Sequence, residues 1–418
     1  MQKATYLKFW IMPVGGNDTS QIIGREIEEF EKSHPGIKVD LSVVPWTQAW
    51  KDIITAAKRR QLPDIFQIGN TWTKTLTSIS SLADLTERVS EDKMKSKFHP
   101  VAWSTCEDEA TGNVFAVPWG AEARMLFYRK DIFKKAKLSI EDVSTWDQFY
   151  NTCKTINGCD GGNGPIGALG IPDIKDQGLV HDVAPWVWSG GGDYLTKDGL
   201  YAAFNKPEAV KGIKLYFDLM EKDYAPIRDR KVPGYAVYDF FVSGKYGMCI
   251  AGAFVAAGYL PGFFGTSLSC RSQEMMDKFG VAALPAGPGG RFSFLGGSDL
   301  AISNHSMNKH EAWQFIKFLT SNDTQIRLYK NIGALPSGIE PFASLFCQGT
   351  EQEKILKQTY SDYGRSYRQI DFWGGVEFII SELFGSLIDS IKSRKYDERL
   401  LSAEIAKYAG QVDYILSL

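Results

Sequence analysis

The chain is poor in the residues from which metal sites are built. Its 418 residues include six Cys and five His, and these are scattered. No two cysteines form C-x-x-C, and no Cys/His cluster has zinc-finger spacing. His305 and His310 are five positions apart, whereas the zinc motif H-E-x-x-H places its histidines at i and i+4. We therefore expect neither a metal nor a cofactor.

Disulfide pairing is open from the sequence alone. Cys153 and Cys159 flank a short polar segment and are close enough along the chain to form a bridge in an oxidising compartment. The alternative is that both are free thiols.

Motifs for phosphate binding and nucleophilic catalysis are also missing. Residues 162–167 match G-x-G-x-x-G by letters, but they follow a polar loop rather than a strand, and Pro165 has no amide hydrogen for a phosphate. Gly244-Lys245 is followed by Tyr246, where a P-loop needs Ser or Thr. No G-x-S-x-G segment exists. A dinucleotide site, a P-loop and a serine nucleophile elbow are therefore not expected.

The chain lacks a strong charge of either sign and an uninterrupted apolar span. Its net charge is −2, so no basic field favours nucleic acid or an anionic membrane. Residues 246–270 carry no charge, but Pro261 and several glycines interrupt them, which indicates a buried strand, a turn and a helix start rather than a membrane span. The first residues lead directly into a strand pattern, which is typical of a cytosolic chain or of a mature form whose export segment was replaced by Met1.

Aromatic residues, in contrast, are abundant. The 11 Trp, 18 Tyr and 25 Phe make up 13% of a chain long enough for two or three domains. This exceeds what a core requires, so we expect some of these rings to line a binding surface.

The first 70 residues have the pattern of an α/β domain. Leu7 and Phe9 alternate with polar residues as in a strand, and residues 18–30 then place apolar side chains at helical spacing. Residues 37–43 alternate again, which completes a strand–helix–strand unit. Residues 64–68 predict a further buried strand, and later amphipathic helices are predicted at 312–319 and 377–391.

Three polar or aromatic residues fall where these strands end. In open α/β sheets, ligands bind beyond the carboxyl ends of the strands. Trp10 lies at the end of the first strand, and Asn70 and Trp72 follow the strand at 64–68. All three are therefore candidate ligand-binding residues.

Seven segments, in order along the chain, resemble one family. They are Phe30–Val39, Pro63–Phe66, Val117–Phe133, Thr145–Phe149, Phe241–Phe254, Gly296–Ile302 and Ala312–Ser321. The clearest is Phe241–Phe254, which resembles the "G-K-x-A-M-x-x-x-G-x-W" stretch of family 1 extracellular solute-binding proteins, the sugar receptors of bacterial ABC importers. Each match alone is weak, and the ordered set is specific.

The resemblance implies an α/β, periplasmic-binding-protein-like fold in which two α/β lobes are joined by crossing hinge segments. Residues 1–118 plus 292–336 would form the N-terminal lobe, and residues 119–291 plus 337–418 the C-terminal lobe. Ligand would bind between lobes that close on it by a hinge motion.

The same resemblance implies a receptor rather than an enzyme. It would bind an extracellular carbohydrate, most simply an oligosaccharide, and deliver it to the permease subunits of an ABC transporter. We expect a monomer that is extracellular or periplasmic and tethered by an N-terminal lipid absent from this chain, with no nucleic-acid partner. The alternatives are a receptor for another polar solute, such as glycerol phosphate or a polyamine, and a glycoside-acting enzyme, which would need two placed carboxylates.

The resemblance also suggests ligand-binding residues, each with a structural alternative. Glu122 and Arg124 follow the first crossover, where relatives often place polar contacts, and a salt-bridged hinge is the alternative. Phe254 occupies a position where the family usually has Trp, and core packing is its alternative. Asp299 would accept from a ligand hydroxyl or cap a turn.

Three further tryptophans complete the candidate set. Trp186 and Trp188 would point opposite ways if the segment is extended, one toward ligand and one into the core. Trp373 precedes the last long helix predicted from the sequence, and packing is the alternative to a ligand contact.

Overall fold

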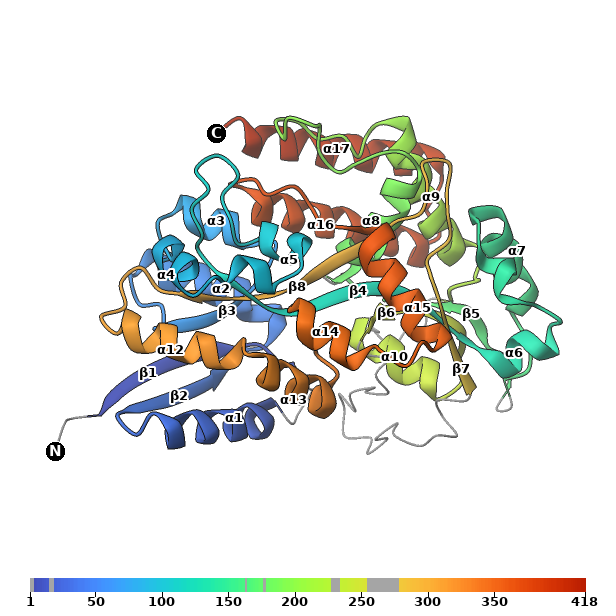
Figure 1. Cartoon of the computed structure of the whole chain (residues 1–418). Coiled ribbons are helices and arrows are strands. Elements are labelled where there is room, and N and C mark those ends of the chain that lie inside the picture. The colour runs from blue at the N-terminus through green and yellow to red at the C-terminus, as the bar shows by residue number, and fades with distance from the viewer. Residues whose placement is uncertain (1–3, 15–18, 162–163, 176–177, 227–233, 254–277) are drawn as a thin grey trace. The chain divides into compact units, whose positions relative to one another are not determined.

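The computed structural model describes residues 4–14, 19–161, 164–175, 178–226, 234–253 and 278–418 (Figure 1). The chain forms two compact units. Unit 1 comprises Met1–Glu122, Gly296–Gln348 and Ser366–Trp373, and unit 2 comprises Ala123–Leu295, Gly349–Arg365 and Gly374–Leu418.

These units differ from the predicted lobes at residues 119–122, 292–295, 337–348 and 366–373. Hydrogen bonds explain why residues 337–348 belong to unit 1. Ser337 Oγ donates to the carbonyl oxygen of Pro118, and Gly338 N donates to Gln325 Oε1, each at 3.0 Å. Residues 366–373 contact unit 1 through Asp371, whose Oδ1 lies 3.7 Å from Lys74 Nζ. Both segments therefore belong with unit 1.

Unit 1 is built on three parallel strands that are extended by antiparallel pairings. Its strands are β1 (Thr5–Ile11), β2 (Ile37–Val43), β3 (Ile65–Gly69), the short β9 (Leu335–Pro336), and parts of the long strands β4 (Val117–Arg129) and β8 (Ser293–Ile302). β1 pairs in parallel with both β2 and β3, and β8 runs antiparallel to β3. The predicted strand–helix–strand unit and the predicted strand at 64–68 are confirmed as β1, β2 and β3.

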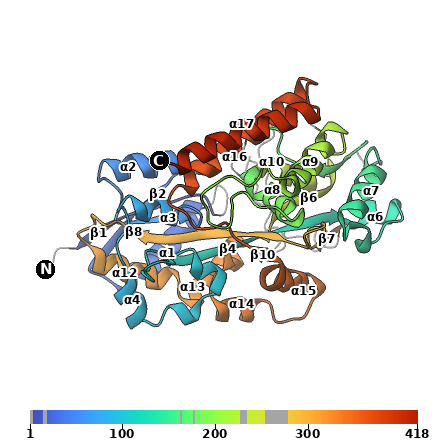
Figure 2. The same cartoon turned by 90° about the horizontal axis from the view of Figure 1, so that it is seen from above.

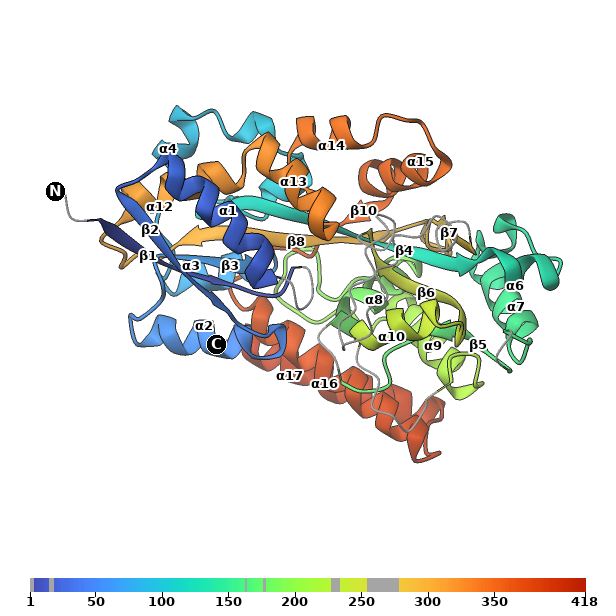
Figure 3. The same cartoon turned by 90° about the horizontal axis from the view of Figure 1, so that it is seen from below.

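Helices cover both faces of this sheet. They are α1 (Thr19–Ser33), α2 (Trp46–Lys58), α3 (Thr73–Ser78), α4 (Thr86–Glu91), the 3-10 turn η2 (Lys95–Lys97), α5 (Pro100–Ser104), α12 (Lys309–Leu319), α13 (Asn322–Ile332) and α14 (Ile339–Leu345). Because β1 lies between β2 and β3, right-handed crossovers put α1 and α2 on opposite faces, as Figure 3 shows. Leu7, Phe9 and Ile11 lie on one face of β1 and are fully buried.

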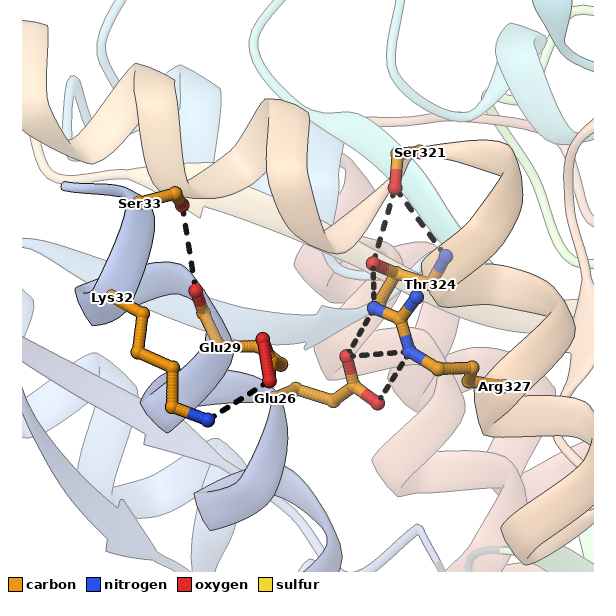
Figure 4. Close-up of polar contacts among 7 residues, drawn as sticks. All are labelled: Glu26, Glu29, Lys32, Ser33, Ser321, Thr324 and Arg327. Carbon is orange, nitrogen blue, oxygen red and sulfur yellow. Dashed lines mark hydrogen bonds and ion pairs between the residues drawn. The ribbon is translucent and has the colours of Figure 1, made fainter.

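An ion pair joins α1 to α13 within unit 1. Figure 4 shows the guanidinium of Arg327 forked over the carboxylate of Glu26, and Arg327 Nη2 lies 2.6 Å from Glu26 Oε2. The same Nη2 also donates to Thr324 Oγ1 at 2.9 Å. The side chain of Glu26 is 6% exposed and that of Arg327 is 41% exposed, so one end of the pair is in water.

The chain passes between units on the strands β4 and β8. Within unit 1, Gly120 on β4 pairs with Pro336 on β9, and Gly297 on β8 packs against the same backbone. A Cβ on Gly297 would lie 2.1 Å from the carbonyl oxygen of Gly120, and its φ is +146°. Only glycine fits this close approach.

Unit 2 has its own sheet, with β4 at its centre. Its other strands are β5 (Gly167–Gly170), β6 (Tyr246–Gly252), β7 (Phe279–Ala282) and β10 (Gly364–Arg365). β6 and β7 run antiparallel to β4, β5 runs parallel to β6, and β10 pairs with the start of β8. All seven residues of β6 are buried. The predicted buried strand in residues 246–270 is therefore confirmed, and residues 254–270 lie outside the described chain.

The helices of unit 2 surround this sheet (Figure 2). They are α6 (Lys130–Lys135), the 3-10 turn η3 (Ile140–Val143), α7 (Trp146–Ile156), α8 (Gly178–Ser189), α9 (Pro207–Glu221), α10 (Gly234–Val242), α15 (Glu351–Gln358), the π-helical turn η5 (Thr359–Tyr363), α16 (Trp373–Lys392) and α17 (Glu398–Leu416). The predicted helices at 312–319 and 377–391 are confirmed as parts of α12 and α16.

Two further observations concern the cysteines and the helices. Cys153 and Cys159 are free thiols, the first buried and the second half-buried, so the free-thiol alternative holds in this structure. Across the ranges that the structure describes, no helix is both long and apolar enough to cross a membrane.

Candidate functional site

A buried carboxyl group marks the candidate site in unit 1. Asp299 lies on β8 opposite Ile68 of β3, and it is 2% exposed. It accepts hydrogen bonds from Thr73 Oγ1 and Thr105 Oγ1, both at 3.1 Å. Burial raises the pKa of Asp299 to about 7, although the two threonine hydroxyls act in the opposite direction. Asp299 is therefore an acceptor of hydroxyl hydrogen bonds, with hydroxyls of the protein itself as its partners.

The strand-end residues gather beside this carboxyl group. Asn70 follows β3 and donates from its backbone N to the carbonyl oxygen of Gly297 at 3.1 Å. Trp72 caps α3, whose first residue is Thr73, the partner of Asp299. The structure thus places Asn70 and Trp72 just after β3, as expected from the strand ends, and Asp299 of β8 lies beside the end of β3.

Trp72 belongs to a cluster of three indole rings. Its ring centroid lies 5.2 Å from that of Trp50 and 6.1 Å from that of Trp46. Trp72 is 3% exposed and Trp46 is 38% exposed, so the cluster extends from the core of unit 1 to solvent. Trp10 is half-buried on β1 and packs against the same core. Trp46 is not among the candidates from the sequence, and its exposure is the feature that recommends it.

Trp373 lies elsewhere in unit 1. It is 2% exposed and stacks on Tyr367, with ring centroids 4.4 Å apart and an interplanar angle of 25°. Its segment approaches α3 through Asp371, which lies near Lys74. The side chain of Trp373 is thus part of the packing of unit 1, and its ligand role stays a prediction.

An ion pair marks the candidate site in unit 2. Arg124 Nε on β4 lies 2.9 Å from Asp182 Oδ1 on α8, and both side chains are 8% exposed. The salt-bridged alternative for Arg124 is thus present in the structure. Glu122, two positions earlier on β4, is half-buried at the end of a segment of unit 1. The ligand-binding roles of Arg124 and Glu122 stay predictions.

A neutral histidine adjoins this ion pair. The His181 ring stacks on Phe294, with centroids 4.2 Å apart and planes 2° from parallel. Burial, and then the charge of Arg124, lowers the pKa of His181 to about 3. Its Nε2 lies 3.6 Å from Glu377 Oε1, but a neutral imidazole makes that contact a polar one rather than an ion pair.

Trp186 and Trp188 lie in the helix α8, so the extended conformation considered for their segment does not occur. Residues two apart on a helix are separated by roughly 200°, so the two rings still point in different directions. Trp186 packs among Trp146, Phe149 and Tyr216. Both rings are 1% exposed.

Trp188 has polar neighbours that the sequence did not indicate. Its Nε1 donates to Asp193 Oδ1 at 3.1 Å, and the guanidinium of Arg365 lies 4.9 Å from its ring centroid. Arg365 also pairs with Asp193, 172 positions away. No local motif marks Arg365 or Asp193, so a single sequence carries no signal for them. Phe254, the remaining candidate, lies outside the described residues.

Together these features are those of a two-unit α/β binding protein. Its candidate polar residues, Asp299 and Arg124, lie on the long strands β8 and β4. Comparison with known proteins is more specific. The sequence pattern of bacterial extracellular solute-binding proteins matches residues 16–326, which is most of the chain. This protein belongs to that family.

Individual relatives and solved structures agree. A Brucella abortus protein named as an unconfirmed binding protein is 28% identical over 311 residues, covering 73% of this chain and 70% of the relative. The diacetylchitobiose binding protein DasA of Streptomyces coelicolor is 26% identical over 340 residues, covering 79% and 73%. The crystal structure of an ABC transporter solute-binding protein from Thermotoga lettingae bound with α-D-tagatose superposes with a TM-score of 0.82, at 21% identity, and covers 99% of this chain and all of that one. The periplasmic-binding-protein fold is thereby established.

Proposed function

We propose that this protein is the carbohydrate receptor of a bacterial ABC importer, and that it binds a neutral oligosaccharide without chemical change. The observation that carries the proposal is the indole cluster in unit 1, which extends from buried Trp72 to exposed Trp46 beside the hydrogen-bonding groups of Asn70 and Asp299. The family supports a solute receptor, and the relative named for diacetylchitobiose supports a sugar.

The chemistry of a sugar explains why this combination suits it. A pyranose ring has apolar C–H faces, which pack on flat aromatic rings, and a rim of hydroxyls, which need acceptors and donors. Trp46 supplies an exposed ring, and its Nε1 is bonded to the carbonyl oxygen of Pro13 at 3.0 Å, which fixes the ring's orientation. Because the ring is already fixed, little side-chain entropy is lost when a ligand packs on it.

Candidate contacts are also proposed in unit 2. There Arg124, beside Asp182, and Trp188, beside Arg365, have the guanidinium and indole groups that recur in sugar recognition. Their side chains are nearly buried in this structure. We propose that binding is reversible, with an affinity of about −8 to −10 kcal/mol.

The remaining features of the proposal concern partners and location. The receptor would act as a monomer, deliver its ligand to permease subunits, and be held outside the cell by an N-terminal lipid. The family, which is extracellular, supports the location. Metabolic labelling of the full-length native protein with a palmitate analogue would test for this lipid anchor. Labelling that is lost when the native leader sequence is removed supports the anchor, and a native protein that is not labelled contradicts it.

A thermal-shift screen against oligosaccharides tests the central proposal. A ligand at 100 times its dissociation constant should stabilise the protein by roughly 2.7 kcal/mol. Diacetylchitobiose and maltotriose represent β- and α-linked neutral glycans, while glycerol 3-phosphate and spermidine represent the other polar solutes. Stabilisation only by a charged solute, or by none of the four and by no larger glycan, would contradict the proposal.

Product analysis separates a receptor from a glycoside-acting enzyme. After long incubation with a glycan that binds, the glycan should be recovered unchanged. Release of shorter sugars in proportion to protein concentration would instead assign catalysis.

A further inference from the structure

A hollow lies within unit 2, and none of its lining residues is among the candidate ligand contacts named above, although Trp146 packs against Trp186. It has a volume of about 480 Å³ and lies between α7 and α9. Its lining residues are Trp146, Asp147, Tyr150, Asn151, Lys211, Lys214, Leu215 and Asp218. All eight belong to unit 2, so the hollow does not depend on how the two units are placed. Its volume is within the range of about 300–1,000 Å³ that small-molecule sites occupy.

The α7 wall presents two aromatic rings. Trp146 and Tyr150 are four residues apart and therefore lie on one face of the helix. Trp146 is half-buried, and its Nε1 donates to Ser189 Oγ at 3.2 Å. A Cβ on Gly287 would lie 2.6 Å from Trp146 Cε2, so the chain passes close under the indole. The ring is thus held in place without a ligand, as a stacking platform requires.

The α9 wall combines an apolar side chain with an internally balanced ion pair. Lys211, Lys214, Leu215 and Asp218 follow helical spacing along one face. Lys214 bonds to Asp218, and its Nζ also lies 3.6 Å from Glu398. Asp218 in turn accepts a hydrogen bond from the Tyr396 hydroxyl at 3.3 Å. The charge of Lys214 is therefore already compensated.

The charges of the lining select the class of ligand. Two lysines and two aspartates line the hollow, so its formal charge is zero. A phosphate ligand would need uncompensated cations, and a polyamine would need uncompensated carboxylates. The lining instead offers two aromatic rings and a leucine for C–H faces. Asp147, Asn151 and Lys211, which are all exposed, can bond to hydroxyls at the rim.

We infer that this hollow is a carbohydrate-binding site of its own, specific for neutral saccharides and confined to unit 2. Because several of its lining residues are exposed, the ligand stays partly solvated, and the expected dissociation constant is about 1 mM, which is weaker than that proposed for transport. The site would hold one end of a glycan near the receptor surface independently of ligand capture elsewhere.

Fluorine NMR of the whole chain labelled with 5-fluorotryptophan tests this inference. The Trp146 resonance is assigned by its loss in Trp146→Phe, and the other tryptophan resonances report on the rest of the protein. Titration with maltotriose or diacetylchitobiose should shift the Trp146 resonance with an apparent dissociation constant of about 1 mM. Inorganic phosphate and spermidine, at equal concentrations, should leave it in place.

A pair of tyrosine variants provides the matched control. Tyr150→Ala should weaken the response of the Trp146 resonance by about tenfold or more, because it removes one ring of the hollow. Tyr201→Ala makes the same change at a residue of unit 2 that is 59% exposed and outside the hollow, and it should have no effect. Asn151→Ala, at an exposed position, gives a second test should Tyr150→Ala fold poorly.

The outcomes separate this site from the proposed transport function. If about 10 mM saccharide shifts other tryptophan resonances but leaves that of Trp146 in place, the inference is overturned and the transport function is left intact. A Trp146 response equal in the tyrosine variants, or one caused only by phosphate or spermidine, would also overturn it. If saccharide shifts the Trp146 resonance saturably and moves no other tryptophan resonance, the result supports a site in the hollow without supporting transport.

Discussion

Each unit contains a buried carboxyl group, and the two groups have different hydrogen-bonding and charge partners. In unit 1, Asp299 receives two neutral hydroxyl donors, from Thr73 and Thr105. In unit 2, Asp182 faces the guanidinium of Arg124. A neutral environment leaves a carboxyl group free to take up a proton, whereas a buried ion pair makes each charge depend on the other. The difference makes one site sensitive to pH and the other sensitive to the loss of a partner.

The largest expected effect is on the ion pair of unit 2. Arg124→Met should destabilise unit 2 by roughly 3–5 kcal/mol, because Asp182 would remain as an uncompensated buried charge. Chemical denaturation followed by tryptophan fluorescence would measure the change. Unit 2 supplies several of the reporting rings, including Trp186 and Trp188.

A double variant shows whether the loss of stability comes from the unpaired charge of Asp182. Arg124→Met with Asp182→Leu removes both charges and should recover much of the lost stability, since apolar replacements of buried ion pairs are often neutral or better. Equal losses in the single and double variants would show instead that the packing of Arg124 itself is what matters.

The next effect is the pH response of unit 1. The pKa of Asp299 is about 7 in the folded protein and near its ordinary value of 3.8 in the unfolded chain. Between these values the folded state holds a proton that the unfolded chain has released, so stability is full below about pH 4 and falls as pH rises toward 7. Asp299→Asn should remove this slope, which amounts to at most about 4 kcal/mol at ~1.4 kcal/mol per pKa unit.

Melting temperatures of Asp299→Asn and the parent across about pH 4–8 would measure this slope. Asp108→Asn is a control of opposite sign. A hydrogen bond from Lys74 lowers the pKa of Asp108, so that carboxylate contributes stability at neutral pH that is lost as pH falls. Parallel curves for Asp299→Asn and the parent would show that Asp299 does not titrate in this window.

Much of unit 1 was predictable because its sequence pattern is local. Alternation in β1 and β2 and the 3.6-residue spacing of α1 each match one periodicity, and the end of β3 was recognisable just before Asn70 and Trp72. Asp299 was predicted from family resemblance, and the pairing of β3 with β8 explains its position, because Asp299 lies opposite Ile68, which is 231 positions away.

The segment containing Trp186 and Trp188 was not predictable in the same way. Ten of the twelve residues of α8 are buried, so no polar face reveals the helical period, and Pro185 and the glycines after Ser189 suggest extended chain. Arg365 and Asp193 come together from distant parts of the sequence, where no spacing rule applies. Burial on all sides and long-range pairing are thus the two causes of the missed features.

The smallest expected effect concerns an ion pair that is only half buried. Arg327 forms a fork with Glu26 between α13 and α1, but its side chain is 41% exposed, so water screens the charge in a way that it cannot at Arg124. Arg327→Lys keeps the charge and loses the fork, and it should cost about 1 kcal/mol or less in denaturant unfolding. Added salt should reduce the difference between Arg327→Lys and the parent, while leaving that of Arg124→Met nearly unchanged. A loss at Arg327 as large as that at Arg124, insensitive to salt, would mean that hydrogen-bond geometry rather than burial sets the strength of both pairs.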